Sequence, residues 1–181
     1  MRNYHSIQME NSVVQHGIGF GAIYLTYINN FTVTNCRIQQ NTYTALSAIS
    51  SKIFFQSNNT FIGNTGVDGG AIRLCSDSFL VFRNHTHIRF INNHAENAGG
   101  AIFVQEDCNM ASLLCFFQLS PTTSELLNTG IPMVNQQLEI SLEFENNTAA
   151  YAGNDVYGGF VDFCVMVIPT FNPRSTDAFN H

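Results

Sequence analysis

The chain has 181 residues and a formal net charge of −6; 45% of its residues are apolar and only 11% are charged. This length suffices for one domain with a substantial core, and the apolar fraction excludes disorder by composition. Seven basic residues are too few for a patch that neutralises phosphates, so no nucleic acid partner is expected. With 21 asparagines and a single lysine, the surface is expected to be polar rather than charged.

No apolar run reaches the roughly 20 residues that cross a bilayer as a helix. The longest runs are LLCFF at 113–117 and FCVMVIP at 163–169. The opening MRNYHSIQME lacks the apolar segment of a signal peptide. We expect no membrane-spanning segment in this chain, and an extracellular location would make it a fragment of a larger protein or a chain whose export signal is missing.

A repeat unit runs through the chain and ends each time on an apolar residue. These closing residues are placed at Ile23, Ile49, Ile72, Ile102 and Val156, at intervals of 26, 23, 30 and 54 residues. The last interval has the length of two units with an insertion. About 11 or 12 residues before most closing residues stands an apolar residue with Asn three positions later: Ile38/Asn41, Phe61/Asn64, Phe90/Asn93 and Phe144/Asn147.

Short alternating stretches at 30–34, 79–82, 87–90 and 138–144 predict strands, and no stretch has a helical period. All four prolines follow residue 120, and Pro is kept out of stacked strands because it lacks a backbone donor. We therefore predict regular coils over 1–105, an irregular insertion at 106–137, a further coil at 138–160 and an exit segment at 161–181.

A unit of 22–30 residues with two or three short strands predicts one coil of an all-β parallel solenoid, with about five to six coils in the chain. Phe61 is expected to stack on Phe90 inside the solenoid, and Asn64 on Asn93 at a bend. Two Gly-Gly steps, Gly69-Gly70 and Gly99-Gly100, are expected to supply positive φ values at a tight corner. A single coil cannot bury its own apolar face, so the repeat has a structural cause.

The motifs FIGN, FINN and FENN, with GGAI at 69–72 and 99–102, resemble the repeats of the chlamydial polymorphic membrane protein family. This resemblance covers about residues 38–160. It implies a right-handed parallel β-helix, exposure at a cell surface and a role in adhesion. Similar repeats also occur in large surface proteins of simple animals and protists, which CFFQ and AGNDVYGG resemble more closely. We expect no C-terminal barrel region in this sequence, so the outer-membrane anchoring of the bacterial family is not carried over.

Candidate chemistry is sparse. Asp68 and Glu96 are expected in equivalent turns of adjacent coils near Arg73, where they form either a cation or sugar site or two solvated carboxylates. His85 and His87 lie on one strand face by the period of two, with His94 in a turn; they are metal ligands or, more commonly, exposed polar residues. No nucleophile constellation and no phosphate loop is present, so neither a catalytic residue nor a cofactor is predicted.

The remaining candidate sites are sites of covalent modification, namely a disulfide and N-linked glycans. Cys108 and Cys115 form a candidate disulfide, whereas Cys36 is expected to be a buried thiol. Four sequons for N-glycosylation begin at Asn30, Asn58, Asn84 and Asn146, and alternation predicts that Asn146 points outward.

The favoured hypothesis is a non-catalytic extracellular or cell-surface module that is structural or adhesive, contacts glycans or other surface proteins, and continues into a longer β-helix. Its polar flanks and the insertion at 106–137 are the expected contact surfaces. The alternatives are a polysaccharide-active enzyme (lyase, hydrolase or epimerase) on the same fold, and a spacer whose binding is unchanged when 106–137 is deleted. Uncapped solenoid ends predict poor solubility for the isolated chain.

Overall fold

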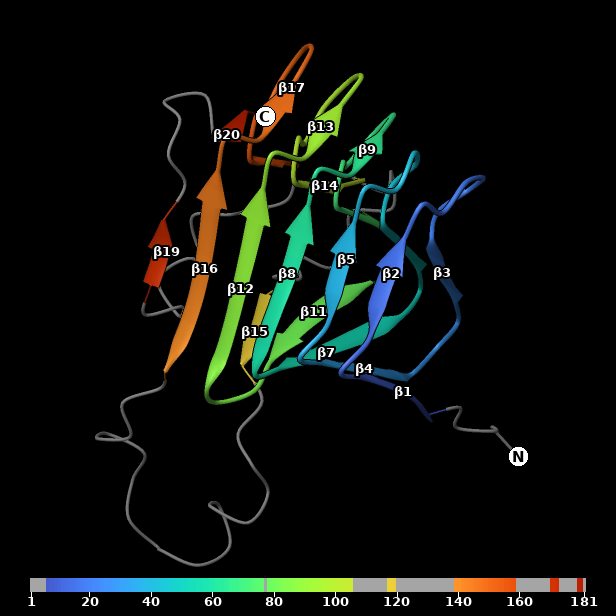
Figure 1. The fold of residues 1–181 in the computed structure, drawn as a ribbon, viewed down its shortest axis with the longest axis vertical. Coiled ribbons are helices and arrows are strands. Elements are labelled where there is room, and N and C mark those ends of the chain that lie inside the picture. The colour runs from blue at the N-terminus through green and yellow to red at the C-terminus, as the bar shows by residue number, and fades with distance from the viewer. Residues whose placement is uncertain are drawn as a thin grey trace, which may run out of the picture.

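The computed structural model describes residues 6–76, 78–105, 117–119, 139–158, 170–172 and 179–180. In this part of the chain all regular structure is β, and all strand pairs are parallel. The chain winds right-handed around a common axis, and its three long sheets form the three sides of the coil (Figure 1). The predicted all-β right-handed parallel β-helix is confirmed.

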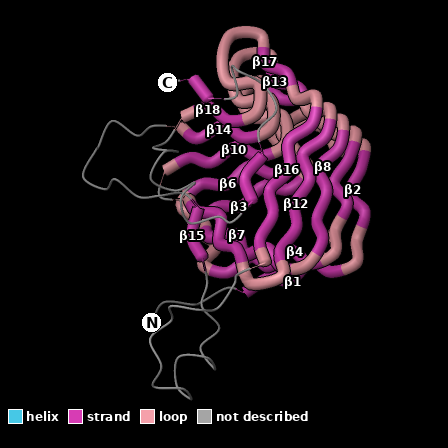
Figure 2. Tube along the Cα trace, turned by 90° about the vertical axis from the view of Figure 1, so that its left-hand side faces the viewer, coloured by secondary structure: helices cyan, strands magenta, loops and turns pink. Residues whose placement is uncertain are grey.

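Sheets A and B form two of the three sides, and each contains one strand from every coil. In spatial order, sheet A contains β1 (Ser6–Glu10), β4 (Asn30–Thr34), β7 (Lys52–Gln56), β11 (Phe79–Phe82) and β15 (Phe117–Leu119). Sheet B contains β2 (Val13–Gln15), β5 (Arg37–Gln39), β8 (Asn58–Ile62), β12 (Thr86–Ile91), β16 (Ile140–Glu145) and β19 (Thr170–Asn172). Figure 2 views sheet B with its strands side by side.

Sheet C forms the third side, and the small sheet D covers the corner between sheets B and C. Sheet C contains β3 (Ile23–Thr26), β6 (Leu46–Ile49), β10 (Ile72–Cys75), β14 (Ile102–Val104), β18 (Val156–Tyr157) and β20 (Phe179–Asn180). Sheet D contains β9 (Thr65–Gly66), β13 (His94–Ala95) and β17 (Thr148–Ala149).

Four successive coils, from β1 to β14, are described almost without interruption. Strands β15 to β18 belong to a fifth coil, and β19 and β20 extend sheets B and C beyond it. The continuously described coils are thus slightly fewer than the predicted five to six. The predicted insertion at 106–137 and the exit segment at 161–181 lie mostly outside the described residues, and that division of the chain stays a prediction.

The core consists of columns in which each coil places the same inward position on top of the last. In sheet B the register aligns Ile38, Phe61, Phe90 and Phe144. The ring centroids of Phe61 and Phe90 are 5.2 Å apart, and those of Phe90 and Phe144 are 5.0 Å apart, with nearly parallel planes. Burial of each such side chain contributes about 1.5–3 kcal/mol, which no isolated coil gains.

One closing residue was placed wrongly from the sequence. Ile72 pairs with Leu46, and Leu46 pairs with Ile23, so Leu46 closes the second coil and Ile49 lies three residues further on. The cause is a shorter corner: four residues separate Asn41 from Leu46, whereas seven separate Asn64 from Ile72. Both Leu46 and Ile49 are apolar, so the pattern did not distinguish them.

Each bend of the coil has a residue in the left-handed region, and most of these residues are not glycine. At the bend that follows sheet B, four coils have a residue other than glycine at the same position. These residues are His16 (φ 57°), Gln40 (φ 53°), Asn92 (φ 52°) and Asn146 (φ 53°). In the third coil this position is Gly63, with φ 59°. Asn tolerates this conformation better than most residues, which gives one physical reason for the Asn-rich composition.

In the described residues, no helix is long and apolar enough to cross a membrane.

Candidate functional site

A ladder of asparagine side chains runs through the interior beside the corner between sheets B and C. Asn41, Asn64, Asn93 and Asn147 are all at most 5% exposed. The Asn41 Nδ2 donates to Asn64 Oδ1 at 2.8 Å, and Asn64 Nδ2 donates to Asn93 Oδ1 at 2.9 Å. The Asn93 Nδ2 donates in turn to Asn147 Oδ1 at 3.0 Å. The ladder satisfies buried polar groups and fixes the point at which each corner leaves the coil.

Each ladder residue also holds the strand of the coil before it. The Asn64 Nδ2 donates to the Ile38 carbonyl at 3.0 Å, and the Asn93 Nδ2 donates to the Phe61 carbonyl at 3.1 Å. The same amide oxygens accept backbone N–H groups, as between Asn64 N–H and Asn93 Oδ1 at 3.1 Å. One Asn side chain therefore satisfies groups that strand pairing leaves open at the bend.

The two glycines of each Gly-Gly step have different roles. Gly69 and Gly99 have φ +69°, a conformation that other residues rarely adopt. The positive φ expected of each step is thus supplied by its first glycine, whereas Gly70 and Gly100 do not have a positive φ. A Cβ on Gly70 would lie 2.6 Å from the His94 carbonyl oxygen and closer still to that of Gly100, so the second glycine is required by close packing of the coils.

The corner between the Asn ladder and sheet C projects from the solenoid in every coil (Figure 1). We call this row of corners the turn ridge. Neighbouring corners are joined by backbone hydrogen bonds, such as Asn97 N–H to the Val67 carbonyl at 2.8 Å and Tyr151 N–H to the Asn97 carbonyl at 2.9 Å. The turn ridge comprises residues 17–22, 42–45, 65–71, 94–101 and 148–155.

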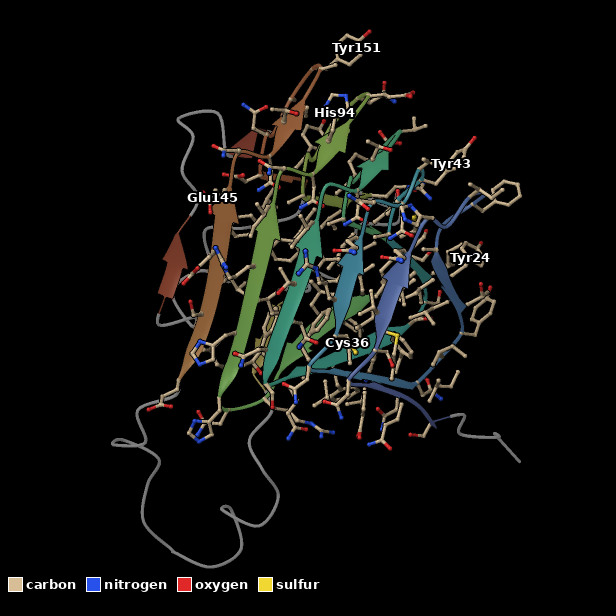
Figure 3. All side chains as sticks on the ribbon, in the orientation of Figure 1. Tyr24, Cys36, Tyr43, His94, Glu145 and Tyr151 are labelled. Atoms are coloured by element: carbon tan, nitrogen blue, oxygen red, sulfur yellow. The ribbon has the colours of Figure 1, made fainter. Side chains whose placement is uncertain are left out.

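Large apolar side chains are exposed along the turn ridge. The exposed fraction is 93% for Phe20 and 82% for both Ile18 and Tyr151. Tyr43 and Val67 are 47% and 43% exposed. Figure 3 shows Tyr43 and Tyr151 pointing away from the solenoid. Of the nine large apolar side chains that are exposed in the described part of the chain, five thus lie on this one edge.

Residues 87–105 match the family model described as the Chlamydia polymorphic membrane protein (Chlamydia_PMP) repeat. This confirms the repeat type predicted from FINN and GGAI. The polymorphic membrane protein repeat runs from β12 across Asn93 and the corner at 94–101 to β14, so it contains one ladder residue and one segment of the turn ridge. Comparison with curated proteins gives no match, and comparison with solved structures gives none either.

Sheet B has a mostly polar outer surface, which we call the polar face, although Val13 on β2 is 60% exposed. Arg89 on β12 lies between two carboxylates of β16, with Nε 3.4 Å from Glu143 Oε2 and Nη2 3.6 Å from Glu145 Oε2. These groups are largely exposed, and such surface pairs contribute little stability. On the neighbouring coils, Gln39 Nε2 donates to Gln15 Oε1 at 2.8 Å. The polar face pairs its own groups, whereas the turn ridge presents apolar side chains to solvent.

The three histidines that were candidate metal ligands are held by different neighbours. His85 Nδ1 lies 2.7 Å from Glu139 Oε2, and both side chains are more than 60% exposed. His94 Nδ1 lies 2.8 Å from Thr148 Oγ1 on the turn ridge. His87 pairs in register with Asn58. Within the described ranges no group of three His, Cys, Asp or Glu side chains is placed to hold a metal ion.

Asp68 and Glu96 are offset by one residue rather than equivalent. The Glu96 N–H donates to the Gly66 carbonyl and the Asn97 N–H donates to the Val67 carbonyl. In parallel pairing this register places Glu96 beside Val67 and Asn97 beside Asp68. The insertion of one residue in the fourth corner causes the offset. Arg73 Nη2 donates to Gln105 Oε1 at 2.9 Å, on sheet C.

The described cysteines are both buried. The Cys36 Sγ lies 3.1 Å from the Thr34 carbonyl oxygen and 3.3 Å from that of Met9, and the thiol is free. Cys75 is 6% exposed. The candidate pair Cys108 and Cys115 lies outside the described residues.

A second ladder, of serines, was not anticipated from the sequence. The Ser51 N–H donates to Ser78 Oγ at 3.1 Å, and the Ile28 N–H donates to Ser51 Oγ at 3.0 Å. These serines are buried at the bend between sheets C and A. Ser51 and Ser78 are 27 residues apart, which matches the length of one coil, and this interval is the sequence signal for the ladder.

Proposed function

We propose that this chain is a non-catalytic β-helix module of a cell surface or of the extracellular space, and that it makes adhesive contacts through the turn ridge. The polymorphic membrane protein repeat at 87–105 supports the surface role. The exposed apolar side chains of the turn ridge support the contact role, because such side chains gathered on one edge mark interaction sites. The partner is a surface protein or a glycan.

The composition of the turn ridge suits recognition. Its corners read NTYTA, NTGVDGGA, NHAENAGGA and NTAAYAGND, each counted from its ladder residue. Tyr supplies a large contact area at low cost in side-chain entropy, and Asn, Thr and Gly supply adaptable hydrogen bonding. The corners are mounted on a rigid stack of coils, as binding loops commonly are. The observation that carries the proposal is the exposure of Tyr151 at 82% and Phe20 at 93%.

Binding to cells tests this proposal directly. The full chain is secreted from animal cells behind an added leader, labelled, and titrated onto cell panels and glycan arrays. In the double variant Tyr43→Ser and Tyr151→Ser, loss of two contact tyrosines is expected to weaken binding about 30-fold or more, the equivalent of about 2 kcal/mol. Thermal unfolding is expected to stay unchanged, because both side chains are exposed.

Tyr27 supplies the matched control. It is 72% exposed but lies at the bend between sheets C and A, on a different edge from the turn ridge. Its equivalents in the next two coils are Ser50 and Ser76, so Tyr27→Ser introduces the residue that the other two coils have at this bend. Unchanged binding is expected for this variant. Equal losses in the control and the ridge variant, or no loss in either, would contradict the proposed site.

A further inference from the structure

The four N-glycosylation sequons differ in how the fold holds their acceptor side chains. The structure describes all four, and two of the asparagines are exposed while two are half-buried. Asn58 and Asn146 are the exposed residues. Asn30 and Asn84 are the half-buried ones. Because an N-linked glycan is large and hydrated, it requires an acceptor that points into solvent.

The hydrogen bonds separate the same two pairs. Asn84 Oδ1 accepts the His85 N–H at 3.1 Å and the Glu139 N–H at 2.9 Å, so this amide joins two coils. Asn30 Oδ1 accepts the hydroxyl of Thr32 at 3.0 Å. Within the described part of the chain, the side-chain amides of Asn58 and Asn146 have no hydrogen-bond partner. Attachment of a sugar to them therefore disrupts no contact of the folded coil.

The threonines at the third sequon positions follow the same division. Thr32 is 3% exposed, and Thr86 is fully buried with its hydroxyl donating to the Arg83 and Phe55 carbonyls. Thr60 is half-buried, and Thr148 is exposed on the turn ridge. The folded coil therefore accommodates a glycan at Asn58 and at Asn146, whereas a glycan at Asn30 or Asn84 would displace half-buried, hydrogen-bonded groups.

We propose that Asn58 and Asn146 are N-glycosylation sites and that Asn30 and Asn84 are not. The donor is a lipid-linked diphosphate oligosaccharide. The Asn Nδ2 forms a bond to C1 of the first sugar, one amide proton passes to a base of the transferase, and the C1–O bond to the diphosphate breaks. The lipid diphosphate leaves with that electron pair, and nothing is oxidised or reduced.

The two sites lie at opposite ends of the polar face. Asn58 begins β8, and Asn146 follows directly after β16. A strand of five or six residues is about 17–20 Å long, so glycans at both ends cover much of the polar face. The glycan on Asn146 borders the fifth corner of the turn ridge, because the ladder residue Asn147 comes next, and the other corners carry no sequon asparagine. This inference rests on the proposed surface location and adds a reason why contact occurs at the turn ridge.

The test is the mass of the full chain, expressed behind a secretory leader in animal cells, before and after enzymatic removal of N-glycans. Asn58→Gln and Asn146→Gln are each expected to remove one glycan, and Thr148→Ala is expected to match Asn146→Gln, whereas Thr148→Ser is expected to restore the glycan. Asn30→Gln and Asn84→Gln are expected to leave the mass of the glycan unchanged. Chain that is imported but retained in the cell is weighed together with secreted chain, so failure to leave the cell does not remove the readout.

Two results overturn the inference. One is the absence of sugar from either Asn58 or Asn146 in imported chain, and the other is the presence of sugar on Asn30 or on Asn84. Neither result bears on the proposed function, which depends on cell binding by the same preparation. A chain that carries glycans at Asn58 and Asn146, and whose cell binding is the same with and without the changes Tyr43→Ser and Tyr151→Ser, would overturn the proposed function and leave this inference standing.

Discussion

The Asn147 Nδ2 donates to Asp155 Oδ1 at 3.0 Å, and both side chains are at most 5% exposed. This bond ends the described Asn ladder. Val156 pairs with Ile102, so Asp155 occupies the place of Ala101 in the previous coil, where the side chain is a methyl group. The preceding residue acts similarly, because Asn154 Oδ1 accepts the Ala149 N–H at 2.9 Å. The fifth corner thus supplies from its own side chains the acceptors that a following coil supplies elsewhere.

This arrangement predicts that Asp155→Ala lowers the free energy of unfolding by about 1–3 kcal/mol, because the buried Asn147 amide loses its acceptor. Asp155→Asn keeps an oxygen at the same position and is expected to be less damaging. Urea unfolding of the three proteins measures the difference. Equal losses in the two variants would show that the acceptor at Asp155 is not what stabilises this corner.

An isosteric change inside the ladder tests its donors. Asn93→Asp replaces an amide nitrogen that donates to Asn147 Oδ1 and to the Phe61 carbonyl with an oxygen that repels both. We expect a loss of about 3 kcal/mol or more at neutral pH. Asn92→Asp, one residue earlier and exposed, is the control and is expected to cost less than about 0.5 kcal/mol.

The same variant has a pH dependence of known sign. Burial raises the pKa of the introduced carboxyl above its unfolded value of about 3.9, and the protonated acid can donate to Asn147. Stability of Asn93→Asp is therefore highest below that unfolded pKa and falls as the pH rises through the raised folded pKa. Urea unfolding between acid and neutral pH measures this. A loss that is independent of pH would contradict the ladder as the cause.

The coil could be predicted from the sequence because residues that recur along the chain also stack on one another in the folded coil. Phe61 and Phe90 are separated by one coil, and a column requires the same residue type at each level. The closing residue of the second coil was missed because Leu46 and Ile49 are equally apolar and corner length varies. The exposed apolar side chains of the turn ridge were not predicted, because their exposure depends on how each corner projects from the coil. Nothing in the residue type distinguishes the exposed Tyr43 from a buried aromatic residue.

The central aromatic column predicts a large cavity effect. Phe90 is 1% exposed and stacks on both Phe61 and Phe144, so Phe90→Ala is expected to cost about 3–5 kcal/mol. Phe103 also stacks, with its ring 5.5 Å from that of Tyr157, but this pair lies on the outside of sheet C and is half-buried. Phe103→Ala is expected to cost about 1 kcal/mol. Comparable losses for the two variants in urea unfolding would mean that the interior column is not the dominant source of stability.

The corner glycines allow a separation of packing from backbone conformation. A Cβ on Gly70 would clash with the backbone carbonyl oxygens of Gly100 and His94 in the next coil. Backbone atoms cannot move aside as the end of a flexible side chain can. Gly70→Ala is therefore expected to cost about 3 kcal/mol or more. Gly63 has a positive φ of 59° but open space around its Cα, and its equivalent in the second coil is Gln40 with φ 53°. Gly63→Gln is thus expected to cost about 1 kcal/mol or less. Thermal unfolding of both variants decides the matter: a Gly70→Ala protein as stable as the parent would mean that adjacent coils separate at the corner without loss, and the close packing described for the turn ridge would then have no role in stability.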